Sequence, residues 1–388
     1  MLAGIQFTHI ADFMIMMPLG PQFMRQFRIG PHQFGVLVSC YTFSAAIAGL
    51  LAALVVDRFD RKKLMLALYG GFGLITLLCG LVPGYTSLLV ARSLAGAFGG
   101  VLSAMIFTLI GDLIPEHRRG RATGTVMAAF SIATIFGVPM GLYLANHFHT
   151  WRAPFIFLGA LSLLILLVGQ WVLPNVNQHV RAQPHNWRET LTQIVMVLKH
   201  RNHQKAFAFM ALMMFSGFTV IPFISIYLTT NAGLPESDLP YIYLAGGAAT
   251  LFSSRLIGRL ADHHGKPRVY RGVALCSLVP LYLMTHLAPV NLGWIIALLV
   301  LFFVFVSGRV IPGMAAVTSS AIPQYRGTFM SLNASVQQAA SGLAALVGGF
   351  IVSRNASGML VGYSYVGYVA IGATLIAMWL VGRLKIEH

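Results

Sequence analysis

The chain has 388 residues, of which 57% are hydrophobic and only 9% are charged, whereas soluble domains carry roughly 25% charged residues. Together with a mean hydropathy of +0.76, this composition excludes a soluble globular protein and indicates an integral membrane protein. The net charge of +16 does not indicate nucleic-acid binding, because the basic residues lie in short clusters between apolar segments.

Apolar segments recur along the whole chain and are separated mostly by short turns. A window of about 20 residues, the length that crosses a bilayer, selects twelve predicted transmembrane helices. The three cysteines lie singly within these segments, so the sequence predicts neither a disulfide framework nor a metal site, and no cofactor is expected. The predicted helices cover residues 5–24, 33–56, 64–83, 86–113, 122–145, 152–173, 206–229, 240–261, 271–288, 293–317, 328–352 and 361–382.

The first predicted helix carries an ionisable pair in "FTHIADFMIMMPLG". Asp12 is the only carboxylate clearly inside a predicted span, about 12 Å from the helix start at 1.5 Å per residue. A charge at that depth costs about 2.5 kcal/mol or more unless it is paired, protonated or hydrated, so we expect Asp12 to face the bundle interior. His9 shares its helix face and could relay a proton, or it could lie near the membrane surface. A static ion pair with a neighbouring helix is the alternative role for Asp12.

Charged junctions repeat along the chain. The junction "LLAALVVDRFDRKKLML" after the second helix is matched by "SRLIGRLADHHGKPRVY" after the eighth, and "IPEHRRGRATG" after the fourth by "IPQYRGTFM" after the tenth. Asp262 follows Asp57 by 205 residues, and Pro323 follows Pro115 by 208. Two landmarks with nearly one offset predict two six-helix halves in parallel repeat.

One connection is long and polar, and within it "NWRETLTQIVMVLKH" has an amphipathic helical pattern with Asn186 as a plausible N-cap. The sequence therefore predicts an N-terminal six-helix bundle (1–173), a cytoplasmic linker with an amphipathic helix (174–205) and a C-terminal six-helix bundle (206–388). The predicted fold is an all-α membrane protein of twelve transmembrane helices in two pseudo-symmetric bundles.

The basic residues predict the orientation of the chain. Of 26 Lys and Arg, 18 follow even-numbered helices or lie at the C-terminus, four follow odd-numbered helices and four lie within spans. Because cytoplasmic loops are enriched in Lys and Arg, both termini and the long linker are expected in the cytoplasm.

The junctions carry a resemblance to a known family. The segment "GRLADHHGKPR" resembles the loop signature G-x-L-x-D-R-x-G-R-R/K of the major facilitator superfamily, and the first copy keeps the acid and several basic residues but lacks both glycines. The resemblance covers the twelve spans, the central linker and both signature loops. The matching positions are Gly258, Leu260, Asp262, Gly265 and Lys266, with Asp57, Arg58, Arg61 and Lys62 in the first copy.

These signature residues predict a latch at the cytoplasmic side. An acid at a helix end beside arginines can bridge neighbouring helices, and breaking such a network would let one half rock against the other. A purely topological role is the alternative, but acids contribute little to the positive-inside bias, so we favour a latch for Asp57 and Asp262. The predicted latch comprises Asp57, Arg58, Arg61, Arg255, Gly258, Asp262, Gly265, Lys266, Asp112 and Arg118.

The fifth helix resembles that of the proton-coupled drug and sugar exporters of this family. The fifth helix contains "FGVPMG", similar to the G-P-x-x-G motif of these exporters, although a valine separates Gly137 from Pro139, and Gly141 closes the motif. A generic kinked packing helix is the alternative, since glycine lets helices approach and proline bends them. Arg92 in "LLVARSLAG" resembles the family's helix 4 arginine, in a motif associated with proton coupling. We therefore group it with Asp12 and His9, whose position inside the first span predicts the same role.

Arg309 lies near the middle of the tenth predicted helix, in "FVFVSGRVIPG". The adjacent glycine and proline suggest a broken helix that borders a cavity. We expect Arg309 to bind a substrate anion or to counter Asp12. Methionine, aromatic and amide side chains complete the predicted binding pocket, although all three also serve as ordinary packing residues in membrane helices. These candidates are Met16, Met213, Phe218, Asn333 and Gln337.

The function predicted from the resemblance and from the buried charges is secondary active transport. No G-x-x-x-x-G-K-[ST], H-E-x-x-H or G-x-S-x-G motif occurs, so neither ATP hydrolysis nor enzyme activity is predicted. We expect proton-coupled efflux of a small organic solute by alternating access, from a monomer in a bacterial inner membrane. Two alternatives stay open: a facilitator or symporter for an organic anion that uses Arg92 and Arg309, and a non-transporting sensor or scaffold whose basic linker recruits a partner or anionic lipid.

Overall fold

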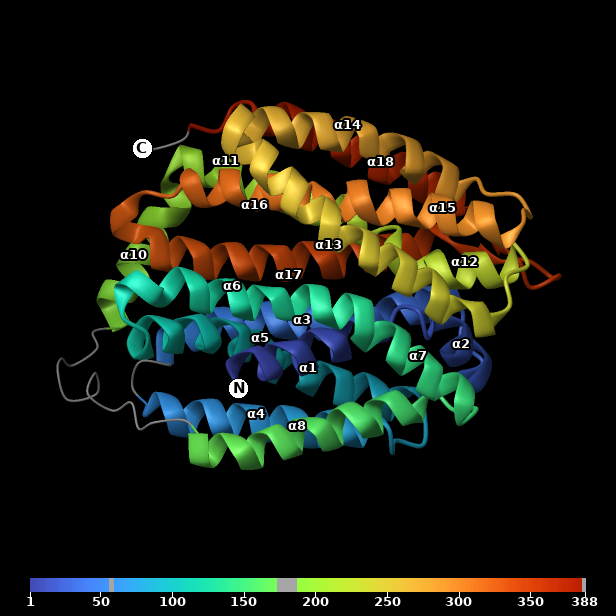
Figure 1. Cartoon of the computed structure of the whole chain (residues 1–388), viewed down its shortest axis with the longest axis horizontal. Coiled ribbons are helices and arrows are strands. Elements are labelled where there is room, and N and C mark those ends of the chain that lie inside the picture. Colours follow the sequence, from blue (N-terminus) through green and yellow to red (C-terminus); the bar gives the residue numbers. More distant parts are fainter. Residues whose placement is uncertain (56–58, 173–186, 386–388) are drawn as a thin grey trace.

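A computed structural model describes residues 1–55, 59–172 and 187–385. Its helices run roughly along one long axis and form two bundles, one from each half of the chain (Figure 1). We call the end where residues 172 and 187 lie the linker end, on the left of Figure 1, and the opposite end the far end.

The first half crosses the long axis six times. Its first crossing is bent by 57° between two helices, and its fifth contains one π-helical turn. The elements are α1 (Leu2–Ile15), α2 (Gly20–Phe27), α3 (Pro31–Val55), α4 (Arg61–Cys79), α5 (Tyr85–Leu113), α6 (Glu116–Ile132), η2 (Ala133–Gly137), α7 (Val138–His147) and α8 (Arg152–Val172).

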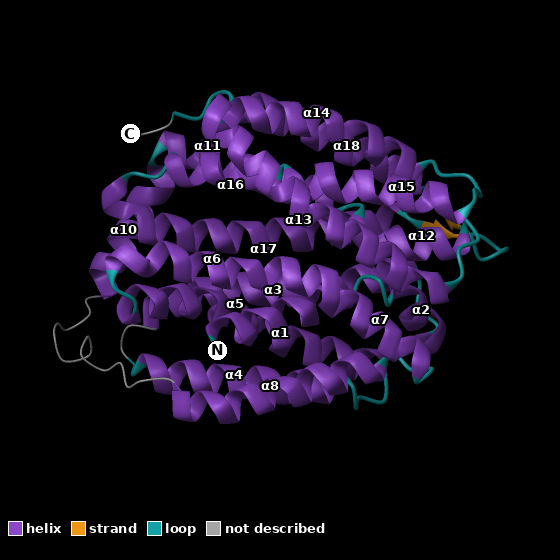
Figure 2. Ribbon diagram, in the orientation of Figure 1, coloured by secondary structure: helices purple, strands orange, loops and turns teal. Residues whose placement is uncertain are grey.

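The second half repeats this arrangement and adds a two-stranded antiparallel hairpin at the far end, drawn in orange in Figure 2. The elements are α10 (Trp187–Lys199), α11 (Arg201–Phe218), η3 (Ile221–Phe223), α12 (Ile224–Thr230), η4 (Glu236–Asp238), α13 (Leu239–His264), α14 (Lys266–Thr285), α15 (Leu292–Phe302), η5 (Phe303–Ser307), α16 (Val310–Ser319), η6 (Pro323–Tyr325), α17 (Arg326–Ile351), β1 (Ser353–Arg354), β2 (Leu360–Val361) and α18 (Tyr363–Val381).

The described helices confirm the predicted fold class. Within the residues that the structure describes, nine helices are long and apolar enough to cross a membrane, and the bent α1–α2 pair makes a tenth. The remaining two crossings are α13 and α14, which meet at the strongly charged signature turn. The segment with the amphipathic pattern is helical, as α10, whereas its predicted N-cap Asn186 lies outside the described ranges.

Prolines interrupt four of the crossings. A proline lacks the N–H that a helix interior needs and its ring clashes with the preceding turn. The prediction of one continuous first helix over 5–24 is therefore wrong, because the chain leaves helical geometry between Ile15 and Gly20, around Pro18. The π-helical turns η2 and η5 lie just before Pro139 and Pro312, and η3 contains Pro222. The break that we predicted beside Arg309 is thus present.

The two bundles meet along α3 and α17, which lie side by side in the middle of Figure 1. Small residues let these helices approach closely. A Cβ built on Gly35 would lie 2.7 Å from the carbonyl oxygen of Ala345, and one built on Gly342 would lie 2.6 Å from Thr42 Oγ1. A second seam joins α13 to η2 and α7.

Buried apolar side chains form three clusters whose positions differ between the two ends. The largest contains residues of both halves, such as Phe34 and Phe223, whose ring centroids are 6.1 Å apart. The other two lie toward the linker end, and each contains residues of one half only among those described. The halves therefore share a core at the far end and have separate cores at the linker end.

Candidate functional site

Helices α1 and α5 bring Asp12 and Arg92 together in the interior of the first bundle. Arg92 Nη1 donates to Asp12 Oδ2 at 2.7 Å, and the side chains of Arg92 and Asp12 are 1% and 0% exposed. Asp12 Oδ1 and Arg92 Nε have no hydrogen-bond partner among the described residues. An ion pair held this far from water stores a large desolvation penalty, and removing either partner leaves an uncompensated charge.

Aromatic rings cover the guanidinium group of Arg92. Its Cζ lies 4.4 Å from the ring centroid of Tyr41 and 5.8 Å from that of Phe155. A cation held over a ring and away from water gains about 2 kcal/mol or more. Tyr41 in turn stacks on Phe13 at 5.3 Å. Sequence reasoning missed Tyr41, because a tyrosine in an apolar helix gives no local sign of the cation that it covers.

His9 lies in the same bundle, and its side chain is buried among other side chains. Its Nδ1 lies 3.4 Å from Ser103 Oγ, and its Nε2 has no partner among the described residues. A Cβ built on Gly99 would lie 2.6 Å from both His9 Nε2 and Tyr41 Oη. The bare backbone at Gly99 is therefore what lets His9 and Tyr41 share one small space.

Arg309 lies in the second bundle and does not contact Asp12. Its Nη1 donates to Thr374 Oγ1 at 2.8 Å and to Ser277 Oγ at 3.3 Å, and its Nη2 donates to Ser216 Oγ at 2.9 Å. These hydroxyls belong to α18, α14 and α11, all in the same half as Arg309. Of the two roles that we considered for Arg309, the second is therefore wrong: the charge of Asp12 is countered by Arg92 and not by Arg309.

The other predicted pocket residues do not gather on one surface. Met16 belongs to the core shared by both halves, whereas Met213 packs against Gly313 within the second half. Phe218 faces Phe13 of the first half at 5.9 Å between ring centroids. Asn333 is fully buried with its amide 3.9 Å from Met314 Sδ, and Gln337 is half-buried.

The glycines of the helix 5 motif receive side chains of α1. A Cβ built on Gly137 would lie 3.1 Å from Ala11 Cβ, and one on Gly141 would lie 2.6 Å from Ile15 Cδ1. Pro139 lies at the start of α7, directly after the π-helical turn. The motif therefore seats the helix that carries Asp12 against the fifth crossing.

The predicted latch is only partly described. Asp57 and Arg58, and the side chain of Asp112, lie outside what the structure describes. Lys266 Nζ donates to Ser319 Oγ, which ties the start of α14 to the end of α16. Gly265 has φ +90°, a conformation that favours glycine. The remaining described positions are Arg61, Gly258 and the exposed Arg118, Arg255 and Asp262, and no ion pair is described among Arg118, Arg255, Asp262 and Lys266.

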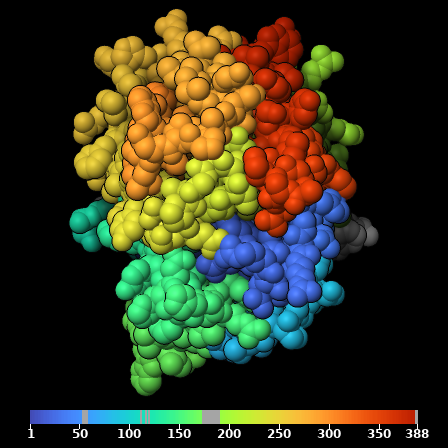
Figure 3. Space-filling model, turned by 90° about the vertical axis from the view of Figure 1, so that its right-hand side faces the viewer, coloured from blue at the N-terminus to red at the C-terminus, as the bar shows by residue number. Residues whose placement is uncertain are grey.

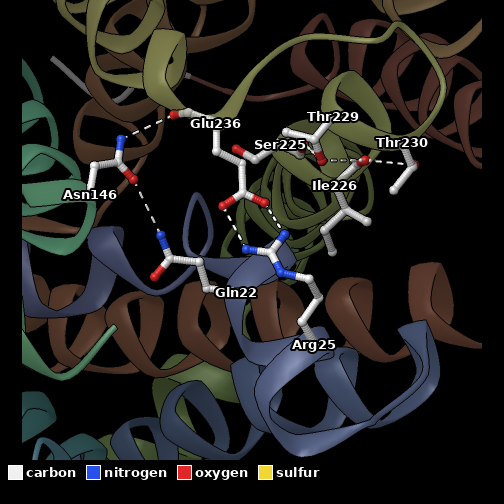
Figure 4. Close-up of polar contacts among 8 residues, drawn as sticks. All are labelled: Gln22, Arg25, Asn146, Ser225, Ile226, Thr229, Thr230 and Glu236. Atoms are coloured by element: carbon white, nitrogen blue, oxygen red, sulfur yellow. Dashed lines mark hydrogen bonds and ion pairs between the residues drawn. The ribbon is translucent and has the colours of Figure 1, made fainter. Parts of the chain in front are cut away.

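The far end carries an ion pair between the halves that sequence reasoning missed. Both terminal nitrogens of the Arg25 guanidinium in α2 donate to the carboxylate of Glu236 in η4, with Nη2 to Oε2 at 2.8 Å (Figure 4). Asn146 of α7 donates to the Glu236 carbonyl oxygen at 3.2 Å and accepts from Gln22 Nε2 at 3.4 Å. We call these four residues the far-end clasp.

A hollow of about 850 Å³ lies beside the clasp and is lined in part by Arg25, Arg28, His149 and Arg152. Figure 3 looks onto this end and shows the blue segments of the first half lying directly against the yellow-green segments of the second. One signal was present in the sequence: Arg25 and Glu236 are oppositely charged and both follow odd-numbered helices.

Comparison with known proteins identifies the family. The sequence model of the Major Facilitator Superfamily matches residues 2–345, which is most of the chain. The chain belongs to the major facilitator superfamily. The predicted family is thereby confirmed, and with it the coarse function, because members of this family are membrane transporters.

Two relatives in Bacillus subtilis (strain 168) illustrate where the chain falls within the major facilitator superfamily. An uncharacterized MFS-type transporter, YceJ, is 25% identical over 374 residues, which cover 94% of this chain and 92% of the relative. Multidrug resistance protein 2 is 22% identical over 367 residues, which cover 93% of this chain and 90% of the relative. A drug-efflux-like protein is thus among the similar sequences.

Solved structures of major facilitator transporters share the fold. A bacterial homologue of the human lysosomal transporter Spinster, in an inward-facing and unoccupied conformation, aligns with a TM-score of 0.73 at 17% identity and covers 99% of this chain and 93% of the homologue. The nucleoside transporter NupG aligns with a TM-score of 0.77 at 13% identity, covering 99% of this chain and 98% of NupG. These similarities support the fold of twelve helices in two bundles.

Proposed function

We propose that this major facilitator protein exports a small organic solute in exchange for protons. The observation that carries the proposal is the buried Asp12–Arg92 pair, because Asp12 is the carboxylate available for titration inside the described membrane-crossing helices. In the charged state Asp12 neutralises Arg92. When Asp12 takes up a proton, Arg92 loses its counter-charge, and the first bundle must relax or bind another group. One proton gained and lost at one carboxylate therefore couples to one structural change.

His9 and Tyr41 extend this proposal toward a route for the proton. His9 is buried on the same helix as Asp12 and shares the space above Gly99 with Tyr41, whose ring covers Arg92. A neutral imidazole carries one hydrogen-bond donor and one acceptor, so a buried histidine is suited to pass a proton between solvent and a buried carboxylate. We assign His9 the relay role and Arg92 the counter-charge role.

The direction of transport rests on the basic residues and on the two ends of the bundle interface. The Lys and Arg bias favours a cytoplasmic linker end, which would make the far end external. The far-end clasp and the shared apolar cluster would then close the protein to the outside, in a state that accepts solute from the cytoplasm. The similarity to Multidrug resistance protein 2 supports efflux.

The proposed exporter also has a defined domain organisation, location and solute site. We also propose two bundles at 1–173 and 206–388 joined by a linker at 174–205, a monomeric state and a location in a bacterial inner membrane. The signature-loop latch would form at the linker end when that end closes. Met16, Met213, Phe218, Asn333 and Gln337 stay candidates for the solute site, and Phe218 is supported by its contact across the two halves.

An organic-anion importer is less well supported. Such a transporter needs cationic side chains directed at the space between the bundles. Arg92 is engaged by Asp12, and Arg309 is engaged by hydroxyls within its own bundle. A sensor or scaffold role has no contact in the described structure that favours it.

The proposal is tested by proton flux in proteoliposomes with an entrapped pH-sensitive dye. The vesicle interior is made acidic, and cationic dyes, neutral drugs and sugars are added outside one at a time. A transported solute should enter in exchange for protons, so that the entrapped dye reports a rise in the internal pH. Asp12→Asn should abolish this coupled flux, whereas Asp238→Asn, at the far end and outside the membrane-crossing helices, should not. Solute flux that ignores the gradient and survives Asp12→Asn would refute proton coupling, and lack of flux with every solute would favour the scaffold.

A further inference from the structure

Arg309 places a full positive charge inside the second bundle, with its side chain 1% exposed. Its hydrogen-bond acceptors are neutral hydroxyls. Each hydroxyl passes its own hydrogen to a helix carbonyl: Ser277 to Ala274 at 2.7 Å, and Thr374 to Ala370 at 2.8 Å. The guanidinium is therefore solvated by dipoles, but its net charge is not neutralised by them.

No carboxylate of the described residues lies within ion-pair distance of Arg309. The described acids of the second half lie at the two ends of the bundle: Glu236 and Asp238 at the far end, and Asp262 at the turn before α14. A lone buried charge at membrane depth is costly, and such arginines almost always pair with an acid, line a water-filled cavity or bind a ligand.

The first bundle also buries an arginine, and there a carboxylate neutralises it. Arg92 lies on the fourth crossing and pairs with Asp12 of the first crossing. Arg309 lies on the tenth crossing, the counterpart of the fourth, and its partner Ser216 lies in α11 of the seventh crossing, the counterpart of the first. The second bundle thus presents the hydroxyl of Ser216, with Arg309 Nη2 2.9 Å away, where the first bundle presents a carboxylate.

Two buried donors remain without a partner among the described residues. They are Arg309 Nε and the hydroxyl of Tyr270. Tyr270 is fully buried in α14 and packs edge-on against Phe209 at 4.8 Å. Its ring lies 3.3 Å from the position of a Cβ built on Gly313, one helical turn after Arg309. A guanidinium N–H and a phenol O–H are both donors, so the group that would satisfy them is an acceptor.

We propose that the second bundle binds one small monovalent inorganic anion, such as chloride, against Arg309 and Tyr270. The anion replaces the carboxylate that the first bundle supplies from its own chain, and it satisfies both buried donors. A single negative charge neutralises the one guanidinium, whereas a divalent anion would leave an uncompensated negative charge. The anion is a resident of the second bundle, and the proposal does not depend on proton-coupled export.

Thermal unfolding of the purified full-length protein tests this binding directly. The unfolding midpoint should rise with added sodium chloride and saturate, and it should not rise with sodium gluconate at matched ionic strength, because a ligand of the folded state stabilises it by mass action. Tyr270→Phe should raise the half-saturating chloride concentration about tenfold, because one hydrogen bond to a charged group is lost. Arg271→Met, which removes an exposed arginine of the same helix, is the matched control and should respond as wild type does.

A variant that adds a negative charge tests the same site without removing the buried arginine. Ser216→Asp should supply a fixed carboxylate beside Arg309, so that its unfolding midpoint no longer depends on chloride. Identical midpoints of the wild-type protein in chloride, bromide, nitrate and gluconate would overturn the proposal. A chloride response that persists unchanged in both Tyr270→Phe and Ser216→Asp would overturn it as well, because the effect would then arise elsewhere.

Discussion

At the scale of single residues, the Asp12–Arg92 pair sets a local energetic rule. Two opposite charges buried together offset much of each other's desolvation cost, whereas burial of either charge alone is strongly unfavourable. The pair is also covered by Tyr41, so that water cannot easily replace a missing partner. The pair can therefore act as a switch only if protonation of Asp12 is accompanied by a change around Arg92.

Removing the charges one at a time and together should reveal this coupling. Asp12→Asn and Arg92→Met should each destabilise the protein by about 3–5 kcal/mol, because each leaves the other charge buried alone. The double variant should be less destabilised than the sum, and we expect it to lie near one single variant. The measurement is a double-mutant cycle on denaturant unfolding of the purified protein, and strict additivity would mean that the pair is not coupled.

The charged residues of the first bundle could be found in the sequence, but their geometry could not. Asp12 and Arg92 stand out because each interrupts an apolar span. Which arginine meets Asp12 depends on how the helices are rotated about their axes, and no local pattern encodes that. The hydroxyls around Arg309 were missed for the same reason, since Ser216 and Thr374 are unremarkable in a membrane helix until the arginine is placed among them.

At the scale of elements, glycine decides how closely the helices of the first bundle pack. A Cβ built on Gly96 of α5 would overlap the carbonyl oxygen of Tyr41 in α3, and Gly100 meets the carbonyl oxygen of Ala45 in the same way. This spacing of four residues places both glycines on one face of α5. The backbone of α3 can therefore lie directly on α5, which fixes where Tyr41 stands relative to Arg92.

Adding one methyl group at this contact should be more harmful than at an open glycine. Gly96→Ala should cost about 1–3 kcal/mol, because backbone atoms must move apart. Gly272→Ala in α14 is the matched control: nothing lies within 4 Å of its Cβ position, and alanine should stabilise the helix by up to about 1 kcal/mol. Thermal unfolding in detergent should rank Gly96→Ala below wild type and Gly272→Ala level with or above it, and the reverse order would contradict the packing.

The helix breaks were partly visible in the sequence. The proline beside Arg309 indicated a broken tenth helix, and the structure has a π-helical turn there. Pro18 gave an equally direct signal in the first helix, but the apolar window extended across it, because hydropathy does not register the missing N–H. Hydropathy therefore located the segments, and backbone chemistry decided where they bend.

At the scale of the whole molecule, the two ends of the bundle interface are held differently. The far end joins both halves through one apolar cluster and through the far-end clasp, whereas the linker end has separate clusters. The repeat offset predicted two bundles, but it carried no information about which end would be joined. Alternative access states of one sequence differ by only a few kcal/mol, and that difference arises from contacts between halves.

Weakening the clasp should raise access from the far end. Arg25 is 60% exposed, so the pair contributes only about 0.3–1 kcal/mol, enough to change the open population by a factor of about two to five. Glu236→Gln should increase maleimide labelling of a cysteine placed at the buried Met24, and exchanging the charges with Arg25→Glu and Glu236→Arg should restore protection. Arg28 lines the same hollow but is not part of the clasp, so the control variant Arg28→Gln should leave the labelling unchanged. Equal labelling in all four proteins would show that the clasp does not hold the far end.

The core shared by the two halves also bears on covalent continuity. An apolar cluster of this kind, with close glycine contacts between α3 and α17, can hold two polypeptides together without a peptide bond between them. Fragments 1–173 and 187–388, expressed from separate genes with a tag on one of them, should therefore assemble in the membrane and copurify. Recovery of the tagged fragment alone would show that the linker is required to bring the halves together. Copurification would show that the two halves assemble as separate chains. Variants of one half could then be combined with variants of the other by coexpression.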